Sequence, residues 1–190
     1  EPPTASITGG PNGPTATNPP TFTFTVGADA TTIQCSVDAQ AFANCTSPFT
    51  TASLSQGAHT FNVQVGDALG NRFTAQRSFS IDTVGPTMAF TSGPSGPSNV
   101  NPPTFGFTIG DAVTVECQVD QGAWLACTSP RTTGQLSQGA HTFNVRGKDA
   151  LGNETLITRS FSIDTVAPAV SVTSGPTGPT NTNPPTFGFS

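Results

Sequence analysis

Four cysteines are the residues of this sequence most able to do chemistry, and their spacing favours two disulfides. They form two C-x9-C pairs, Cys35 with Cys45 and Cys117 with Cys127, and each pair has a turn sequence in its middle. A hairpin folded at that turn places the two cysteines on opposite strands, close enough to bridge. Free thiols or a metal site are the alternatives, but a zinc site would need closer C-x2-C pairs with histidine, and none exists. Disulfides would imply an oxidising, extracellular compartment.

Catalysis would need a base paired with a nucleophile, and the sequence shows no such pair. The two histidines, His59 and His141, stand at the same place in two repeats, just after a glycine turn. A polar residue at the start of a strand explains them more simply, since no serine is visibly partnered with them and the cysteines are committed to disulfides. No glycine-rich phosphate loop precedes a helix, because no helical spacing is present. We therefore expect no enzymatic activity and no cofactor.

Carboxylate and amide side chains recur at two places in each repeat and could bind calcium near a repeat boundary. Calcium takes six to eight oxygen ligands, commonly several carboxylates with backbone carbonyls. Two acids per boundary are few for such a site, and the alternative is that D-A-L-G-N is a turn whose aspartate accepts local backbone hydrogen bonds. The candidate ligands are Asp67, Asn71 and Asp82 in the first repeat and Asp149, Asn153 and Asp164 in the second.

Sugar could be either bound or carried by this chain. Binding would need exposed, coplanar aromatic rings, yet most phenylalanines fall on inward strand positions, and Phe42 and Trp124 lie beside the cysteines, where packing on a disulfide is the simpler role. Carried glycans fit better, because a coat on a hydroxyl-rich surface would keep weakly charged edge strands from associating. An unmodified, threonine-rich surface is the alternative. The candidate attachment residues are Thr15, Thr17, Ser98, Thr180 and Thr182 in three similar loops, and Asn153 in an N-x-T sequence.

Composition and charge exclude several partners. The formal net charge is −5, only 9% of the residues are charged, and Lys148 is the single lysine. A nucleic acid or an anionic membrane surface is therefore an improbable partner. Membrane insertion is not expected either, since no segment approaches the ~18 apolar residues of a membrane span.

The segments that carry these residues recur with a fixed period. Phe22, Phe105 and Phe187 lie 83 and 82 residues apart, and the words SQGAHTFNV and RSFSIDTV each return once, 82 residues later. The sequence thus predicts one unit over residues 1–84, a second over 85–166, and the first two strands of a third over 167–190.

Within each unit, apolar and polar residues alternate, which is typical of half-buried strands. Phe22, Phe24 and Val26 point to one side of their segment, whereas Thr23 and Thr25 point to the other. About seven such strands in 82 residues predict an all-β protein of tandem immunoglobulin-like sandwiches arranged end to end. In the second unit the strands are expected at Met88–Phe90, Phe105–Ile109, Val113–Val119, Trp124–Cys127, Thr132–Leu136, His141–Arg146 and Ile157–Ile163.

The repeated words C-x9-C-T-S-P, G-A-H-T-F and D-A-L-G-N, followed by S-I-D-T-V, resemble the bacterial Ig-like repeat modules of large secreted and cell-surface proteins. The resemblance covers both full units. It implies an Ig-like sandwich with a disulfide and a structural or adhesive role in a long array, and it implies no chemistry.

The function we expect is that of a non-enzymatic extracellular structural protein, a filament or surface stalk of stiffly joined modules, with an adhesin stalk whose binding tip lies elsewhere as the alternative. Pro86 and Pro168 restrict the short linkers, so successive modules should not be flexibly tethered. The partners expected are neighbouring copies of the same repeat. Because the third unit breaks off after two strands, we expect the chain to be a window of a longer polymer, or else to be completed by strand exchange.

Overall fold

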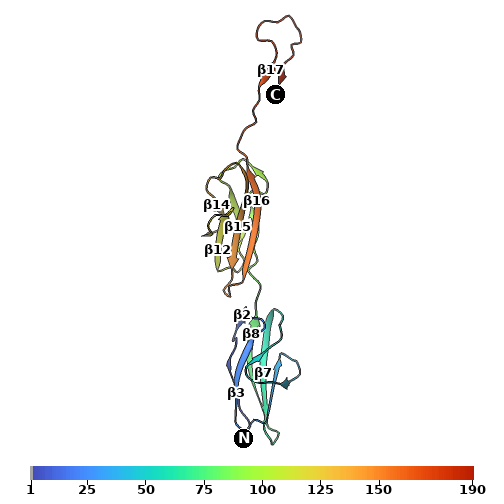
Figure 1. The fold of residues 1–190 in the computed structure, drawn as a ribbon, viewed down its shortest axis with the longest axis vertical. Coiled ribbons are helices and arrows are strands. Elements are labelled where there is room, and N and C mark those ends of the chain that lie inside the picture. The colour runs from blue at the N-terminus through green and yellow to red at the C-terminus, as the bar shows by residue number, and fades with distance from the viewer. Residues whose placement is uncertain (1) are drawn as a thin grey trace.

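The computed structural model describes residues 2–190, and its regular structure consists of strands. Figure 1 shows two elongated sandwiches in line, with a third, smaller pair of strands beyond them. This arrangement confirms the predicted all-β fold of immunoglobulin-like modules placed end to end. No helix able to cross a lipid bilayer occurs in the part of the chain that the structure describes.

The first sandwich contains two sheets. A three-stranded sheet has the order β1-β3-β6, and a five-stranded sheet has the order β2-β8-β7-β4-β5. Its strands are β1 (Ala5–Gly9), β2 (Pro14–Thr15), β3 (Thr21–Val26), β4 (Thr32–Val37), β5 (Ala43–Asn44), β6 (Phe49–Thr50), β7 (Gly57–Gly66) and β8 (Arg72–Ile81).

The second sandwich repeats this topology, with sheets β9-β11-β14 and β10-β16-β15-β12-β13. Its strands are β9 (Ala89–Ser92), β10 (Pro97–Ser98), β11 (Thr104–Thr108), β12 (Thr114–Val119), β13 (Leu125–Ala126), β14 (Arg131–Thr132), β15 (Gly139–Lys148) and β16 (Glu154–Ile163).

Each core is built from the inward positions of the alternating strands. Phe22 of β3 stacks on Phe61 of β7 across the two sheets, with ring centroids 4.2 Å apart, and Phe105 stacks on Phe143 at the same distance in the second unit. All four rings are at most 1% exposed. Burial of such aromatic side chains is the main favourable contribution to a module of this size.

Both predicted disulfides are present, Cys35–Cys45 and Cys117–Cys127, with 5.7 Å between the Cα atoms of each pair. They tie β4 to the segment after β5 and β12 to the segment after β13. The turn of each hairpin contains a non-glycine residue with positive φ, Asp38 in the first unit and Asp120 in the second.

Besides shifts of one to three residues at strand ends, two features of the strands differ from expectation. Each unit contains a short additional strand, β2 or β10, which pairs in parallel with the end of β8 or β16 inside the proline-rich loop. The strand expected over Thr132–Leu136 is wrong, because the strand comprises Arg131–Thr132 and the chain leaves the sheet after the Thr133 amide bonds to the Pro103 carbonyl. There Thr133 donates its hydroxyl to the Gly134 carbonyl, and the Leu136 amide bonds to a side chain.

The third unit contributes β17 (Val172–Ser174) and β18 (Gly188–Phe189), which pair antiparallel as β9 and β11 do. Gly175 has φ +143°, and a Cβ atom there would lie 2.5 Å from the Phe187 ring. Gly93 contacts Phe105 in the same way at φ +110°. The local geometry of the opening strands is thus preserved in the third copy.

Candidate functional site

The D-A-L-G-N segment forms a closed turn around its aspartate. In the second unit Asp149 Oδ1 accepts hydrogen bonds from the backbone amides of Leu151 and Asn153, at 2.8 and 2.9 Å. The Asn153 side-chain amide donates to the other carboxylate oxygen at 2.8 Å. Asp67 makes the equivalent bonds in the first unit. The aspartate therefore folds its own loop, as the turn interpretation predicted.

The same asparagine joins the two sandwiches. Asn153 Nδ2 also donates to the backbone carbonyl of Asp82, at the end of β8, over 2.9 Å. Next to this bond the chain passes very close to the second unit, since a Cβ atom on Gly85 would lie 2.6 Å from the backbone of Glu154. Pro86, the following residue, is fully buried. The linker thus packs against the second unit and is not a free tether.

Comparison of the two copies shows what the contact covers. Leu69, in the first turn, is 87% exposed, whereas its equivalent Leu151 is half-buried. The exposure of the turn aspartate differs in the same sense, because Asp67 is half-buried whereas its equivalent Asp149 is only 7% exposed. Since the two turns have the same internal bonds, the difference comes from the unit that precedes the second turn.

Of the calcium candidates, Asp82, Asp149 and Asn153 meet at the boundary between the two units, whereas the others lie elsewhere. Asp67 and Asp82 lie at opposite ends of β8, about 30 Å apart for a ten-residue strand. Instead Asp82 of one unit meets Asp149 and Asn153 of the next, while Asp164 lies at the far end of β16. Asp82, Asp111 and Asp149 line a hollow of about 350 Å³ there.

That hollow does not have the character of a calcium site. No group of three or more acidic, histidine or cysteine side chains within residues 2–190 is arranged to hold a metal ion. Asn153 directs its amide nitrogen, not its oxygen, at Asp82, and the Asp149 carboxylate already accepts three hydrogen bonds. The contact that the structure shows at the junction is the hydrogen bond from Asn153 to Asp82.

The pKa of each turn aspartate is lowered, which favours its ionised form. Hydrogen bonding by the Asn71 side chain lowers the pKa of Asp67 below its usual value, and the backbone amides of Asn71 and Leu69 add to this. Burial raises the pKa of Asp149, but the hydrogen bonds from Asn153 and the backbone outweigh it, so the pKa is again lowered.

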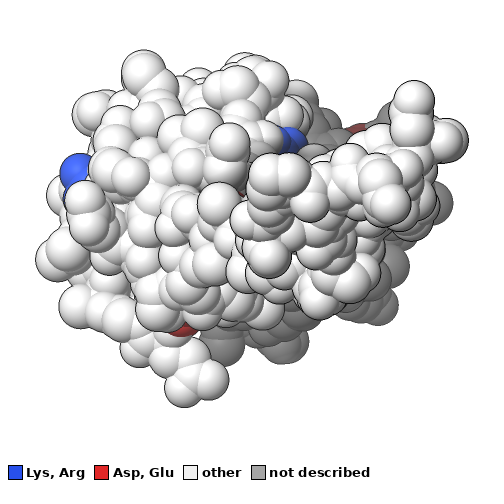
Figure 2. Space-filling view, turned by 90° about the horizontal axis from the view of Figure 1, so that it is seen from above, with Lys and Arg blue, Asp and Glu red and all other residues white. Residues whose placement is uncertain are grey.

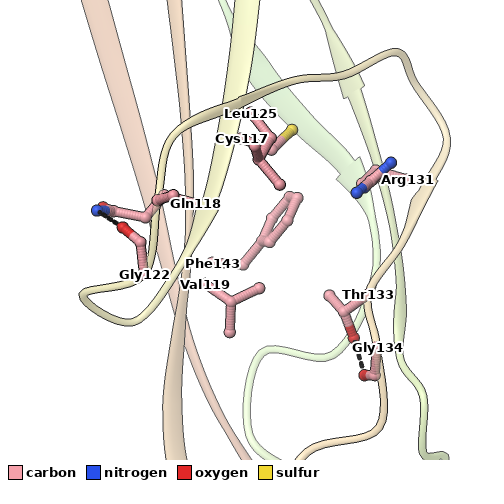
Figure 3. A pocket seen from close by; sticks show the side chains of 10 residues that line it. Cys117, Gln118, Val119, Gly122, Leu125, Arg131, Thr133, Gly134 and Phe143 are labelled. Carbon is pink, nitrogen blue, oxygen red and sulfur yellow. Dashed lines mark hydrogen bonds between the residues drawn. The ribbon is translucent and has the colours of Figure 1, made fainter.

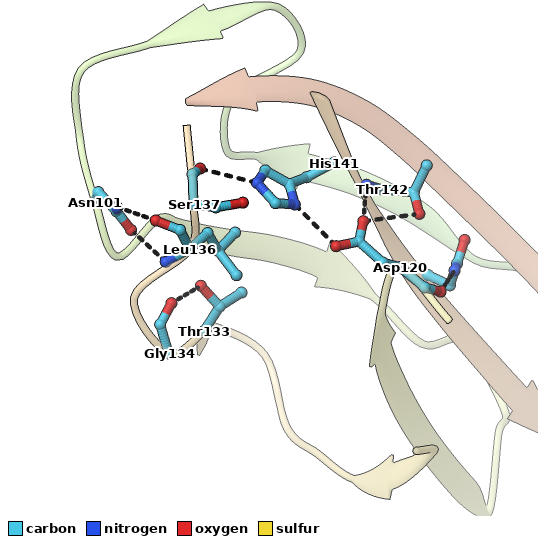
Figure 4. Close-up of polar contacts among 9 residues, drawn as sticks. Asn101, Asp120, Thr133, Gly134, Leu136, Ser137, His141 and Thr142 are labelled. Atoms are coloured by element: carbon cyan, nitrogen blue, oxygen red, sulfur yellow. Dashed lines mark hydrogen bonds and ion pairs between the residues drawn. The ribbon is translucent and has the colours of Figure 1, made fainter. Parts of the chain in front are cut away.

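Each histidine lies in a second polar site, shown for the second unit in Figure 4. His141 Nδ1 is 2.8 Å from Asp120 Oδ2, and Nε2 is 3.0 Å from the Ser137 carbonyl oxygen. The other Asp120 oxygen accepts the Thr142 amide at 2.8 Å. His59 repeats this arrangement with Asp38 and Ser55 in the first unit.

Both nitrogens of each ring face acceptors, and this determines what the histidine can do. A backbone carbonyl can only accept, and an ionised carboxylate only accepts, so the doubly protonated imidazolium satisfies both contacts. Accordingly, the hydrogen bond to Asp38 raises the pKa of His59, and the Ser55 carbonyl raises it further. The pKa of His141 is raised by the same two kinds of bond. Both ring nitrogens of each histidine are thus engaged in contacts within the protein.

One structural residue escaped sequence reasoning altogether. The side chain of Asn101 donates to the Leu136 carbonyl at 2.8 Å and accepts from the Leu136 amide at 2.9 Å (Figure 4). Asn18 makes the same paired contact with Leu54. The recurrence of N-P-P at the repeat period could have marked this asparagine as structural. Nothing in the sequence, however, identifies its hydrogen-bond partner about 35 residues away.

The glycan candidates divide into two kinds. In the first kind, the side-chain hydroxyl accepts a hydrogen bond from the backbone amide two residues later, as in Thr15, Ser98 and Thr180. In the second kind, the residue donates that backbone amide, as Thr17 does to Thr15 and Thr182 does to Thr180. Asn153 uses both hydrogens of its side-chain nitrogen, on Asp149 and Asp82. A glycan on that nitrogen would replace one hydrogen, so attachment at Asn153 would remove one of these two hydrogen bonds.

The outer surface carries little charge. Figure 2, which looks onto the end of the molecule, shows uncharged residues nearly everywhere, with a few isolated basic and acidic groups. Trp124, expected to pack on the disulfide, lies under the Arg146 guanidinium, 4.4 Å from its ring centroid. Its equivalent Phe42 is 37% exposed. No coplanar aromatic platform for sugar forms at these two positions.

Comparison with known proteins adds structural neighbours only. No protein-family model and no curated protein matches the chain. The fibronectin(III)-like modules of Clostridium thermocellum CbhA align with a TM-score of 0.40 at 16% identity, over 84% of this chain and 94% of theirs. Drosophila N-cadherin EC1-4 aligns with a TM-score of 0.45 at 8% identity, over 86% of this chain and 50% of that one. The chain spans about half the length of that cadherin fragment.

Proposed function

We propose that this chain is a non-enzymatic, extracellular structural protein whose repeated sandwiches form a stiff filament or stalk. The observation that carries the proposal is the junction, where Asn153 bonds to Asp82 and Gly85 packs on Glu154. A repeat that provides a hydrogen-bond donor in the turn at one end and an accepting strand-end carbonyl at the other can be extended without limit. The disulfide in each unit suits an oxidising environment outside the cell.

The absence of enzymatic activity is part of the proposal. The histidines are used in structural contacts, and both ring nitrogens are occupied. The two turn aspartates accept backbone amides of their own loops. These groups therefore support the fold and offer no base or nucleophile to a substrate.

The partners we propose are further copies of the same repeat. In the third unit Val172, Phe187 and Phe189 are 73%, 55% and 76% exposed, although the equivalent residues of the full units lie in or against a core. An apolar sheet face of this kind needs a second sheet to cover it. Further strands of the same polypeptide, or strands exchanged from another copy, have the matching pattern.

Covalent glycans on the hydroxyl-rich loops belong to the same proposal. The exposed side chains of Thr17, Thr180 and Thr182 could carry them without disturbing the junction. The intact mass of native material tests this, and a mass equal to that of the bare sequence would rule glycans out.

The junction is tested by comparing Asn153→Ala with Asn71→Ala. Both substitutions remove the bond from asparagine to the turn aspartate, but only Asn153→Ala also removes the bond between units. Residual dipolar couplings measured in solution should fit one common alignment tensor for the two sandwiches in the unaltered chain and in Asn71→Ala. In Asn153→Ala the two sandwiches should require different tensors, because the hinge is freed. Independent tensors in the unaltered chain would contradict a stiff filament.

A further inference from the structure

The two sandwiches differ at several positions close to the disulfide, and one of these differences removes an aromatic ring from beside a cavity. In the first unit Phe49, on β6, packs against the core and stacks on Phe61, with ring centroids 5.6 Å apart. The equivalent residue in the second unit is Arg131, on β14. Its neighbour Phe143, equivalent to Phe61, therefore lacks the ring that covers Phe61.

The space so vacated is a hollow of about 220 Å³. Figure 3 shows the Phe143 ring in its middle, Cys117 and Leu125 on one side, Val119 on another, and Arg131 across the gap. The β12–β13 hairpin forms one wall, and the segment through Thr133 and Gly134 forms the opposite wall. Apolar atoms thus make the floor, and one guanidinium stands at the rim.

Matched neighbours in the first unit confirm that the ring of Phe49 closes this space. Val37 and Thr51 are 6% and 7% exposed there, whereas their equivalents Val119 and Thr133 are half-buried. The backbone pairing around them is the same in both units. The loss of the ring at this position agrees with the greater exposure, and the smaller Gly134 in place of Ala52 acts in the same direction.

The guanidinium at the rim has no protein partner within the described part of the chain. The other four arginines each donate to an acceptor, as Arg159 does to the Ser92 carbonyl. Among residues 2–190, Arg131 makes no such bond, and the four ion pairs found there do not include it. A half-buried, unpaired guanidinium beside an apolar hollow favours an anionic group that can accept two parallel hydrogen bonds.

We propose that this hollow is a binding site for a small aromatic carboxylate. The ring occupies the place that Phe49 fills in the first unit, against Phe143, and the carboxylate accepts hydrogen bonds from Arg131. The size is suitable, since an apolar cavity of roughly 150 Å³ already takes benzene. The stacked pair Phe49–Phe61 shows the geometry that the bound ring adopts. The first unit has no such site, because its own side chain fills it.

Binding is measured on the whole chain by NMR titration with benzoate and phenylacetate. A ligand of this size in an open hollow should bind with a dissociation constant on the order of 1 mM. The shifts should be confined to the surroundings of Phe143 and Arg131. Benzyl alcohol, which has the ring without the charge, should bind at least about fivefold more weakly, and acetate should cause no saturable shift there.

Three variants locate the site. Arg131→Phe copies the first unit and should abolish binding while the fold persists. Arg131→Gln keeps the hollow but removes the charge, so benzoate should lose its advantage over benzyl alcohol. Phe49→Arg should create a second site and raise the stoichiometry from one to two; if that variant does not fold, the two substitutions at Arg131 still decide the question. The proposal is overturned if benzoate shifts no resonance near Phe143 at 20-fold the expected constant (about 20 mM), or if Arg131→Phe binds as well as the unaltered chain.

Discussion

At the scale of single residues, the polar side chains that looked capable of chemistry are used to shape loops. Asp38 and Asp120 hold backbone turns with positive φ and receive both a histidine and a backbone amide. Burial raises the pKa of Asp38, but the hydrogen bonds from His59 and Thr60 outweigh it and lower the pKa. The paired histidine has a raised pKa. Each partner therefore stabilises the charged form of the other.

This coupling predicts how stability depends on pH. The raised pKa of each histidine contributes stability that is complete below about pH 6.5 and is lost as the pH rises through the folded pKa. The lowered pKa of each paired aspartate contributes stability that is complete above about pH 4 and is lost as the pH falls. The melting temperature should thus be highest between these values and decline toward pH 9.

The double variant His59→Gln with His141→Gln tests the alkaline decline. Glutamine can still donate one hydrogen bond but does not titrate, so the melting temperature should be lower at pH 5.5 and nearly constant from there to pH 9. Circular dichroism melts at several pH values measure this. An alkaline decline as steep in the double variant as in the unaltered chain would show that other groups cause it.

At the scale of strands, alternation predicted well wherever a strand has one buried face. Phe22 and Phe24 are buried and Thr23 is exposed, as period two requires. The prediction failed over Thr132–Leu136, because the chain there is held by Thr133 and by the distant Asn101 instead of by a sheet. It also missed β2 and β10, whose two paired residues are too few to show any periodicity.

The candidate site could be predicted only in part, for a related reason. The sequence showed that Asp82, Asp149 and Asn153 recur, but it did not show that the two ends of β8 are separated by the whole length of the sandwich. The cluster therefore forms across units and not within one. The hollow beside Arg131 was equally hidden, since only the position of Phe49 over Phe61 reveals what the arginine replaces.

At the scale of the whole molecule, we propose that the junction seen between the first two units recurs from unit to unit and stiffens the chain. The Asp82–Asn153 bond and the buried Pro86 fix the entry of the second sandwich over the end of the first. Leu69 in the first turn is the equivalent of Leu151, and Asp164 beyond β16 is the equivalent of Asp82. These two residues lie at the outer ends of the pair of sandwiches. A copy added before the first unit would cover Leu69 to the extent that Leu151 is covered here, where it is half-buried.

The third unit provides the last prediction. Two paired strands without a covering sheet are only marginally stable in water, so the β17 amides should exchange with solvent on the order of a thousandfold faster than those of the equivalent strand β9. Extending the chain past Ser190 with the remaining strands of the repeat, as in residues 109–166, should restore the protection. Hydrogen exchange read out by NMR on both chains measures this. Protection that instead grows with the concentration of the 190-residue chain would indicate strand exchange between copies. Full protection of β17 in the dilute, monomeric chain would contradict the need for any covering repeat.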